Sequence, residues 1–384
     1  MQVKNLLYAL AGAGISAAAI ALSKLFSSCS LASPCQSWLS DQALTTLLNH
    51  VGGSRGQEVR KAEFLGYHLT NQTEQDPTYQ ALKDVWKRVA ARTQGKLNMV
   101  VLAKDAELPG ADNEAVLATS RGRFDAVTGD APIFSGIIPQ VANIMTLLFA
   151  YDSSEEGLWL VNQPTFQQVL AENGEAFNLT FLPEATFNAG MRVVTSNSTR
   201  VFDQPKSIKG FRLRTPPSAV VGKQLKAIGV IPIATPITRL IDAITSGMVD
   251  GQENPPSYIE SVGINNVNNQ ISVTNHLWSG FLTAINSQSW NSWPKAWRII
   301  VKEEFKNQQP RQWAQQESLN QTLLQQAPQR LGMLVDRPNL TSLRHDPKLI
   351  KAREQVVMTL DPRLQPLARK LMAGDASSQA TSKP

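Results

Sequence analysis

The chain has 384 residues, of which 42% are hydrophobic and 18% charged, and its formal net charge is +6. This composition is that of a globular protein, and the length fits two domains of common size. The positive charge is too diffuse to indicate nucleic-acid binding, because Lys and Arg form no basic cluster. The two cysteines, Cys29 and Cys35, lie near the N-terminus. The rest of the chain therefore has no disulfide framework and no thiol nucleophile.

The N-terminus has the features of an export signal. Lys4 precedes an apolar run from Leu6 to Leu22, and small residues follow. This order predicts a secretory signal over residues 1–32 and a periplasmic protein. Two alternatives stay open: an uncleaved membrane anchor, since the run is near the lower length limit for spanning a bilayer, and lipidation at Cys29. Residues 33–57, which end in a glycine-rich stretch, are expected to form a linker.

The body begins with alternating strands and helices. Leu82, Val85, Trp86 and Val89 recur at the spacing of one helical face. The expected elements are a strand over 64–69, a helix from Pro77 with Asp76 as its N-cap, a strand over 97–102, a helix over 114–120 and a strand over 124–127. This order predicts a parallel or mixed sheet with helices on both faces.

A second unit repeats this order. We expect a strand over 211–214, a helix ending near Gly229, a strand over 231–234, a helix from Thr235 to Gly247, and a short strand over 248–250 before a turn at 251–256. Two such units predict two lobes with a cleft between them, where ligands bind beyond the carboxyl ends of the strands. From Trp293 the chain reads as helical, and Pro310 should kink or break that helix.

Motifs for catalysis and metal binding are missing. The four histidines are separated in the sequence, and no H-E-x-x-H motif, P-loop or G-x-S-x-G elbow occurs. We therefore expect no metal site, no cofactor and no enzymatic activity.

The most informative residues lie between Gly190 and Asn275. They include the strings Gly190-Met191-Arg192, Thr195-Ser196-Asn197, Ile208-Lys209-Gly210-Phe211-Arg212-Leu213-Arg214, Val249-Asp250-Gly251-Gln252-Glu253-Asn254-Pro255 and Thr274-Asn275-His276. This pattern closely resembles the solute receptors of tripartite ATP-independent periplasmic (TRAP) transporters, of the C4-dicarboxylate-receptor type. The resemblance covers roughly residues 60 to 310.

The resemblance implies a two-lobed periplasmic-binding-protein clamshell of the α/β class, with mixed sheets flanked by helices and a long helical C-terminal part. Lobe I is expected over 58–189 and 279–318, and lobe II over 190–278 and 319–345. A C-terminal helical extension over 346–373 and a disordered tail over 374–384 complete the expected organisation.

The resemblance assigns the main ligand contact to Arg214, at the end of the K-G-x-x-x-R strand. A guanidinium is always charged, and its planar fork can meet both oxygens of a carboxylate, which a lysine cannot do. The alternative is a surface arginine on an edge strand.

Further contacts follow from the same resemblance. Arg192 matches a second family arginine, and its alternative role is a salt bridge between the lobes. Asn254 matches an asparagine that can hydrogen-bond the same carboxylate, and its alternative role is that of a turn residue.

The first lobe offers Asn71, Asp112 and Asp130 as partners for a ligand hydroxyl or amine, although each can equally be a cap or turn residue. Ile237 takes the place of an aromatic residue that often lines the pocket in relatives.

The sequence thus predicts an extracytoplasmic solute-binding protein that captures an organic acid through an Arg–carboxylate salt bridge. Its expected partners are the acid and the membrane permease subunits of a TRAP transporter driven by an ion gradient. The alternatives are a ligand-sensing subunit for a membrane signalling protein and an enzyme on a binding-protein scaffold. The identity of the acid, among dicarboxylates, 2-oxo acids, sugar acids and amino acids, stays open.

Overall fold

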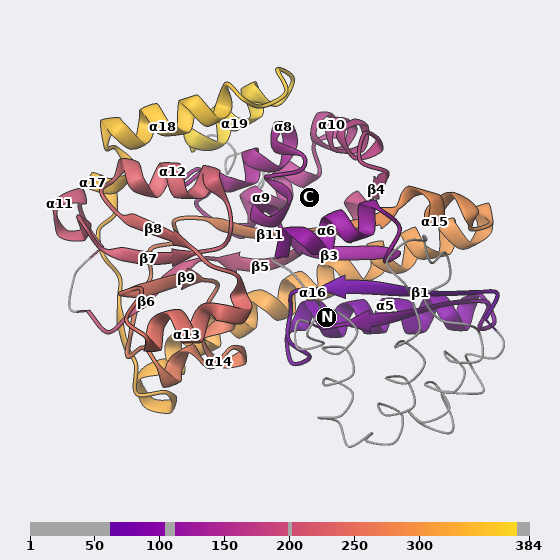
Figure 1. Cartoon of the computed structure of the whole chain (residues 1–384), viewed down its shortest axis with the longest axis horizontal. Coiled ribbons are helices and arrows are strands. Elements are labelled where there is room, and N and C mark those ends of the chain that lie inside the picture. Colours follow the sequence, from indigo (N-terminus) through magenta and orange to yellow (C-terminus); the bar gives the residue numbers. More distant parts are fainter. Residues whose placement is uncertain (1–61, 104–111, 199–201, 375–384) are drawn as a thin grey trace, which may run out of the picture.

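Two six-stranded mixed sheets, each flanked by helices, make up the two lobes of the molecule (Figure 1). The computed structural model describes residues 62–103, 112–198 and 202–374. The predicted α/β class with two lobes and a long C-terminal helix is confirmed. The expected signal segment, both cysteines, the linker and residues 375–384 of the expected tail lie outside the described residues.

The first lobe is built on the sheet with strand order β2-β1-β3-β11-β4, in which β5 also pairs with β11. β1 is parallel to β2 and β3, and β11 is antiparallel to its neighbours. The strands are β1 Phe64–Thr70, β2 Leu97–Leu102, β3 Ala126–Asp130, β4 Leu179–Phe181, β5 Phe187–Met191 and β11 Trp278–Asn286. The helices are α5 Pro77–Arg92, α6 Asp112–Ser120, α7 Ala131–Phe134, α8 Pro139–Ala142, η2 Asn143–Thr146, α9 Ser154–Val161, α10 Pro164–Glu175, η3 Pro183–Ala185 and α15 Ser287–Ser292.

The second lobe is built on the sheet with strand order β12-β10-β6-β9-β7-β8. Its strands are β6 Val193–Ser196, β7 Arg212–Thr215, β8 Ile231–Ala234, β9 Gly251–Asn254, β10 Gln270–Ser272 and β12 Leu334–Asp336. Its helices are α11 Pro205–Ile208, α12 Ala219–Ala227, η4 Ile237–Arg239, α13 Leu240–Thr245, α14 Tyr258–Ser261, η5 Ile264–Asn266 and α17 Thr341–Arg344.

The helix α5 shows how the local sequence sets these elements. The Asp76 side chain accepts a hydrogen bond from the Thr78 backbone N–H at 2.9 Å, and Pro77 occupies the first turn, where its missing N–H costs nothing. Leu82, Val85, Trp86 and Val89 are buried, as their spacing predicts. The helix is thereby fixed on the first sheet.

Within the described residues, the chain crosses between the two sheets at three places. β5 ends at Met191 in the first sheet, and β6 begins at Val193 in the second, so Arg192 lies at the crossing itself. The return runs from β10 to β11 between 272 and 278. The third crossing is α16 Lys295–Arg330, which packs on α5 and β5 and reaches β12. The predicted lobe limits at 189/190, 278/279 and 318/319 stay predictions.

Two expectations about elements are wrong. The strand expected over 248–250 is instead β9, Gly251–Asn254, at residues expected to form a turn. It pairs with β6 and β7 in the middle of the second sheet, so backbone pairing overrides its polar composition. The helix α16 also continues through Pro310 without a break.

The C-terminal helices α18 Pro347–Val357 and α19 Gln365–Met372 pack on both lobes (Figure 1, yellow). Leu349 belongs to a hydrophobic cluster of the second lobe, and Leu364 and Leu371 belong to one of the first lobe. Arg353 donates hydrogen bonds to the carbonyl oxygens of Leu148 at 3.3 Å and Phe149 at 3.4 Å. Within the described ranges, no helix has the length and apolar character needed to cross a membrane.

Candidate functional site

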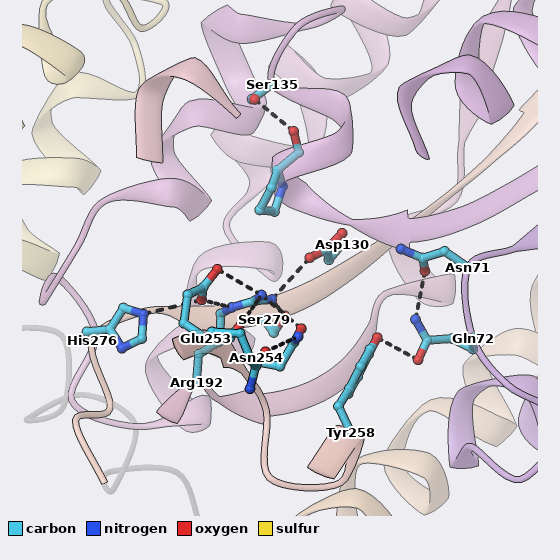
Figure 2. Close-up of polar contacts among 12 residues, drawn as sticks. Asn71, Gln72, Asp130, Ser135, Arg192, Glu253, Asn254, Tyr258, His276 and Ser279 are labelled. Atoms are coloured by element: carbon cyan, nitrogen blue, oxygen red, sulfur yellow. Dashed lines mark hydrogen bonds and ion pairs between the residues drawn. The ribbon is translucent and has the colours of Figure 1, made fainter. Parts of the chain in front are cut away.

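Four of the predicted site residues lie at or near the carboxyl ends of strands. Asn71 follows β1, Asp130 ends β3, Asn254 ends β9 and Arg214 lies near the end of β7. Arg192 occupies the crossing between β5 and β6. Figure 2 shows the polar contacts around Arg192 that join the two lobes.

Arg192 is the centre of a buried network (Figure 2). Its Nε donates to the Glu253 carboxylate, and its Nη1 donates to Asp130 Oδ2 at 3.2 Å and to Ser279 Oγ at 3.0 Å. Its Nη2 donates to the Glu253 carbonyl at 2.9 Å, to Glu253 Oε1 at 3.1 Å and to Asn254 Oδ1 at 3.0 Å. All five N–H groups of the guanidinium therefore have acceptors within the chain.

This arrangement bridges the lobes, because Asp130 and Ser279 belong to the first sheet, and Glu253 and Asn254 to the second. It has the geometry of the alternative role for Arg192, the interlobe salt bridge. A ligand contact by Arg192 stays a prediction.

Charge inside the network is balanced by neighbouring groups. Burial alone disfavours a charged Arg192, but the carboxylates of Glu253 and Asp130 outweigh it and raise the pKa of the guanidinium. Burial likewise opposes ionisation of Glu253, but Arg192, and then His276, hold the pKa of this carboxyl below its usual value. The pair is therefore ionised, and each charge depends on the other.

Arg214 is 1% exposed, so it is not the surface arginine of the alternative reading. Its Nε and Nη2 both donate to the carbonyl oxygen of Thr235, at 2.8 and 2.5 Å. Thr235 directly follows β8, the parallel neighbour of β7. This contact with a neutral oxygen orients the guanidinium without cancelling its charge.

Other side-chain hydrogen bonds also connect the lobes. The Tyr258 hydroxyl of α14 donates to Gln72 Oε1 at 2.6 Å, and Gln72 Nε2 donates to Asn71 Oδ1 at 2.7 Å (Figure 2). Ser135 Oγ of the first lobe lies 3.0 Å from Ser218 Oγ, at the N-cap of α12. Asn71 is thus part of a chain of contacts that reaches the second lobe.

The other predicted residues have different surroundings. Asn254 Nδ2 donates to Gln252 Oε1 at 2.6 Å, so both ends of this amide are engaged. Ile237 begins η4 and is 6% exposed within a hydrophobic cluster that also contains Tyr258. Asp112 begins α6, and its side chain lies outside the described part of the chain.

Sequence reasoning missed five residues around these positions: Gln72, Glu253, Tyr258, His276 and Ser279. Glu253 and His276 stand inside the strings quoted for the family resemblance, but their spacing gave no sign that they meet. His276 Nε2 lies 3.3 Å from Glu253 Oε2. An acidic residue directly before a predicted ligand-binding asparagine was the available signal for Glu253.

Metal ligands do not gather at this site. Over the residues with described positions, no group of three His, Cys, Asp or Glu side chains could hold a metal ion. The expectation that the protein needs no cofactor stays a prediction.

Comparison with known proteins places these features in a family. The model of the bacterial extracellular solute-binding proteins, family 7, matches residues 69–346. A C4-dicarboxylate-binding periplasmic protein of Rhodobacter capsulatus is 29% identical over 183 residues, which are 48% of this chain and 54% of that protein. An uncharacterized Haemophilus influenzae protein is 24% identical over 62% of this chain and 70% of its own length.

Solved structures share the fold. A TRAP periplasmic solute-binding protein from Chromohalobacter salexigens, with bound D-glucuronate, superposes with a TM-score of 0.73 at 21% identity and covers 81% of this chain and 99% of its own. One from Desulfovibrio salexigens, with bound orotic acid, gives a TM-score of 0.71 at 20% identity, with 83% and 100% covered. The chain belongs to the bacterial extracellular solute-binding proteins of family 7, as its resemblance to the TRAP solute receptors predicted.

Proposed function

We propose that this protein captures a small organic acid in the periplasm and delivers it to an ion-gradient-driven TRAP permease. The observation that carries the proposal is Arg214, a buried guanidinium at the end of a strand in a two-lobed receptor fold. Membership of a solute-binding family supports binding over catalysis.

Arg214 is the proposed carboxylate partner. The Thr235 carbonyl holds Nε and Nη2 in place, so the fork is oriented before the ligand arrives. Asn254 and Arg192 are proposed to lie beside the same carboxylate. Asn71, Asp112 and Asp130 are proposed to receive ligand hydroxyl or amine groups, and Ile237 to line the apolar side of the pocket.

Binding is proposed to favour the closed arrangement of the lobes. Hinge closure around a ligand is the usual motion of periplasmic binding proteins, and a ligand shifts it only by its preference for the closed form. The Tyr258–Gln72 and Ser135–Ser218 contacts, which join the lobes, would stabilise the same closed arrangement.

A screen of organic acids tests the proposal. Glucuronate, galacturonate, orotate, succinate and glutamate are suitable probes, and a bound acid should raise the melting temperature by mass action. Arg214→Ala should weaken binding of the best acid by about 3–5 kcal/mol, because a buried carboxylate would lose its partner.

Arg212→Ala is the matched control. Arg212 lies two residues earlier on β7, its side chain is 43% exposed, and it pairs with Asp250. It should bind the acid like the wild type. If folded Arg214→Ala binds the acid as tightly as the wild type, the proposed role of Arg214 is wrong.

Delivery to a permease needs its own measurement. Vesicles that contain the cognate permease pair should accumulate the acid only when the receptor and an ion gradient are both present. Uptake that ignores the receptor would contradict delivery, while chemical conversion of the bound acid would favour an enzyme.

A further inference from the structure

The helix α16 carries a stripe of buried amide side chains. Gln308, Gln312, Gln316 and Asn320 are 7%, 0%, 0% and 5% exposed. Their spacing of four residues places them on one face of the helix. Buried amides are costly unless they are hydrogen-bonded. Their hydrogen-bond partners therefore show which segments this face of the helix contacts.

The first half of the stripe binds the first lobe. Gln308 Oε1 accepts a hydrogen bond from Arg88 Nη2 at 2.8 Å. Gln312 Oε1 accepts from the Asn188 backbone N–H at 2.9 Å, and its Nε2 donates to the Asn188 carbonyl at 2.7 Å. Gln312 thus pairs with β5 in the way that a neighbouring strand would.

The second half contacts two segments that lead into the site, one in β5 and one after β9. Asn320 Nδ2 donates to the Ala189 carbonyl at 2.8 Å, and Asn320 Oδ1 accepts from the Ser257 backbone N–H at 3.0 Å. Gln316 Nε2 donates to Ser257 Oγ at 2.9 Å. One amide therefore ties β5 to the turn that follows β9.

Gly190 makes room for this amide. Its φ is +95°, a left-handed conformation that side chains rarely adopt, and an added Cβ would overlap Asn320 Nδ2. The backbone beside the crossing is thus shaped to receive Asn320.

We propose that Asn320 and Gln316 are positioning residues for ligand binding. Asn320 fixes the distance between Ala189, three residues before Arg192, and Ser257, three residues after Asn254. The two segments that bring the Arg192–Asn254 hydrogen bond into the site are therefore held from behind by α16. The effect on ligand affinity rests on the proposed function, but the effect on the two segments does not.

Hydrogen exchange of the ligand-free protein tests whether Asn320 holds the two segments in place. In Asn320→Ala, backbone amides in both 188–192 and 254–258 should exchange about tenfold faster, because the side-chain hydrogen bonds to Ala189 and Ser257 are lost. Gln316→Ala should affect 254–258 alone. Gln315→Ala, on the exposed face of the same helix, should match the wild type. Unchanged exchange in either segment of Asn320→Ala would overturn the proposal.

The affinity for the organic acid tests whether Asn320 positions the binding site or only supports the fold. Asn320→Ala should weaken binding by about tenfold, and Gln315→Ala should not. Asn320→Asp keeps the acceptor for Ser257, but its carboxylate cannot donate to Ala189. Lowering the pH protonates the introduced carboxyl and restores the donor, so the affinity of this variant relative to the wild type should recover.

Each outcome has one meaning. Affinities of Asn320→Ala and Asn320→Asp equal to the wild type, at any pH, would overturn positioning. If the wild type binds no acid at all, the proposed function fails. The exchange data still decide whether Asn320 holds the two segments in place. If Asn320→Ala does not fold, Gln316→Ala and Asn320→Asp supply both measurements.

Discussion

Glu253 is fully buried, and its ionised form depends on Arg192. With Gln in its place, Asp130 would be the remaining anionic partner of the guanidinium among the described residues of this network. We predict that Glu253→Gln lowers the free energy of unfolding by about 3–5 kcal/mol, the usual effect of removing one partner of a buried ion pair. Urea denaturation measures this loss.

The control is Asp250→Asn, three residues away on the same segment, which breaks the partly exposed Arg212–Asp250 pair. It should change stability little, because solvent screens exposed pairs. Equal losses in the two variants would mean that burial does not set the strength of the Arg192 network.

His68 is buried in a directional chain of hydrogen bonds. Trp86 Nε1 can only donate, so His68 Nδ1 accepts at 2.8 Å and Nε2 carries the proton toward Thr128 Oγ1 at 2.8 Å. Thr128 then donates to Thr283 at 2.7 Å, since the Thr283 hydroxyl donates to the Ala185 carbonyl at 2.8 Å. The chain requires a neutral ring, and burial lowers the pKa of His68 to about 3.

This lowered pKa predicts a loss of stability in acid. Between pH 6.5 and the folded-state pKa of about 3, His68 is protonated in the unfolded chain and neutral in the folded protein. Stability is therefore lost as the pH falls through this range. Between pH 7 and pH 5 the loss should be about 2 kcal/mol. His68→Gln, which supplies an acceptor and a donor but does not titrate, should lack this component. Urea denaturation at a series of pH values measures the free energy of unfolding of both proteins. If it falls by the same amount in both between pH 7 and pH 5, the role of His68 is contradicted.

At the scale of elements, the sequence predicts amphipathic helices and apolar strands, but it does not predict a strand made of polar residues. The spacing of Leu82, Val85, Trp86 and Val89 predicted α5 correctly. In contrast, β9 contains Gly, Gln, Glu and Asn, all buried. Its polar groups are satisfied by other parts of the chain, such as Gln252 Nε2, which donates to Thr195 Oγ1 at 2.8 Å. Local pattern cannot predict a strand whose partners lie far away in the sequence.

The same limit applies to the site. The string around Arg214 predicted a ligand contact through family resemblance. The side chain is buried, and its contact with a ligand stays a prediction. The partners of Arg192 come from β3, β9 and β11, and only the paired sheets bring them together. The sequence could propose an interlobe bridge but could not name Glu253 as its main acid.

Two glycines inside helices predict changes of opposite sign. In α9, a Cβ on Gly157 would overlap the Trp278 ring, whereas in α12 a Cβ on Gly222 would lie 3.7 Å from Pro232. Gly157→Ala should therefore destabilise the protein by about 1–3 kcal/mol through overpacking. Gly222→Ala should stabilise it by about 0.5–1 kcal/mol through helix propensity. Thermal unfolding measures both stability changes. Changes of the same sign in the two variants would contradict this prediction.

For the whole molecule, the Tyr258–Gln72 hydrogen bond links the lobes at a buried position. Tyr258→Phe should cost the closed form about 1 kcal/mol and shift the ligand-free protein toward open arrangements. Small-angle X-ray scattering should then report a larger radius of gyration.

Tyr151→Phe is the matched control, since the buried Tyr151 hydroxyl donates to the Ile144 carbonyl within the first lobe, at 2.9 Å. Its scattering should equal that of the wild type. Identical curves for Tyr258→Phe and the wild type would mean that this contact does not restrain the lobes.

The C-terminal helices have a practical consequence for anyone who shortens this protein. The family match stops at residue 346, but Val357, Leu364, Ala368 and Leu371 beyond it are buried against the first lobe. A version trimmed to the shared region would place that apolar face in water, and such faces drive aggregation. The smallest piece worth expressing therefore extends to Met372, well past the point where the likeness to relatives ends.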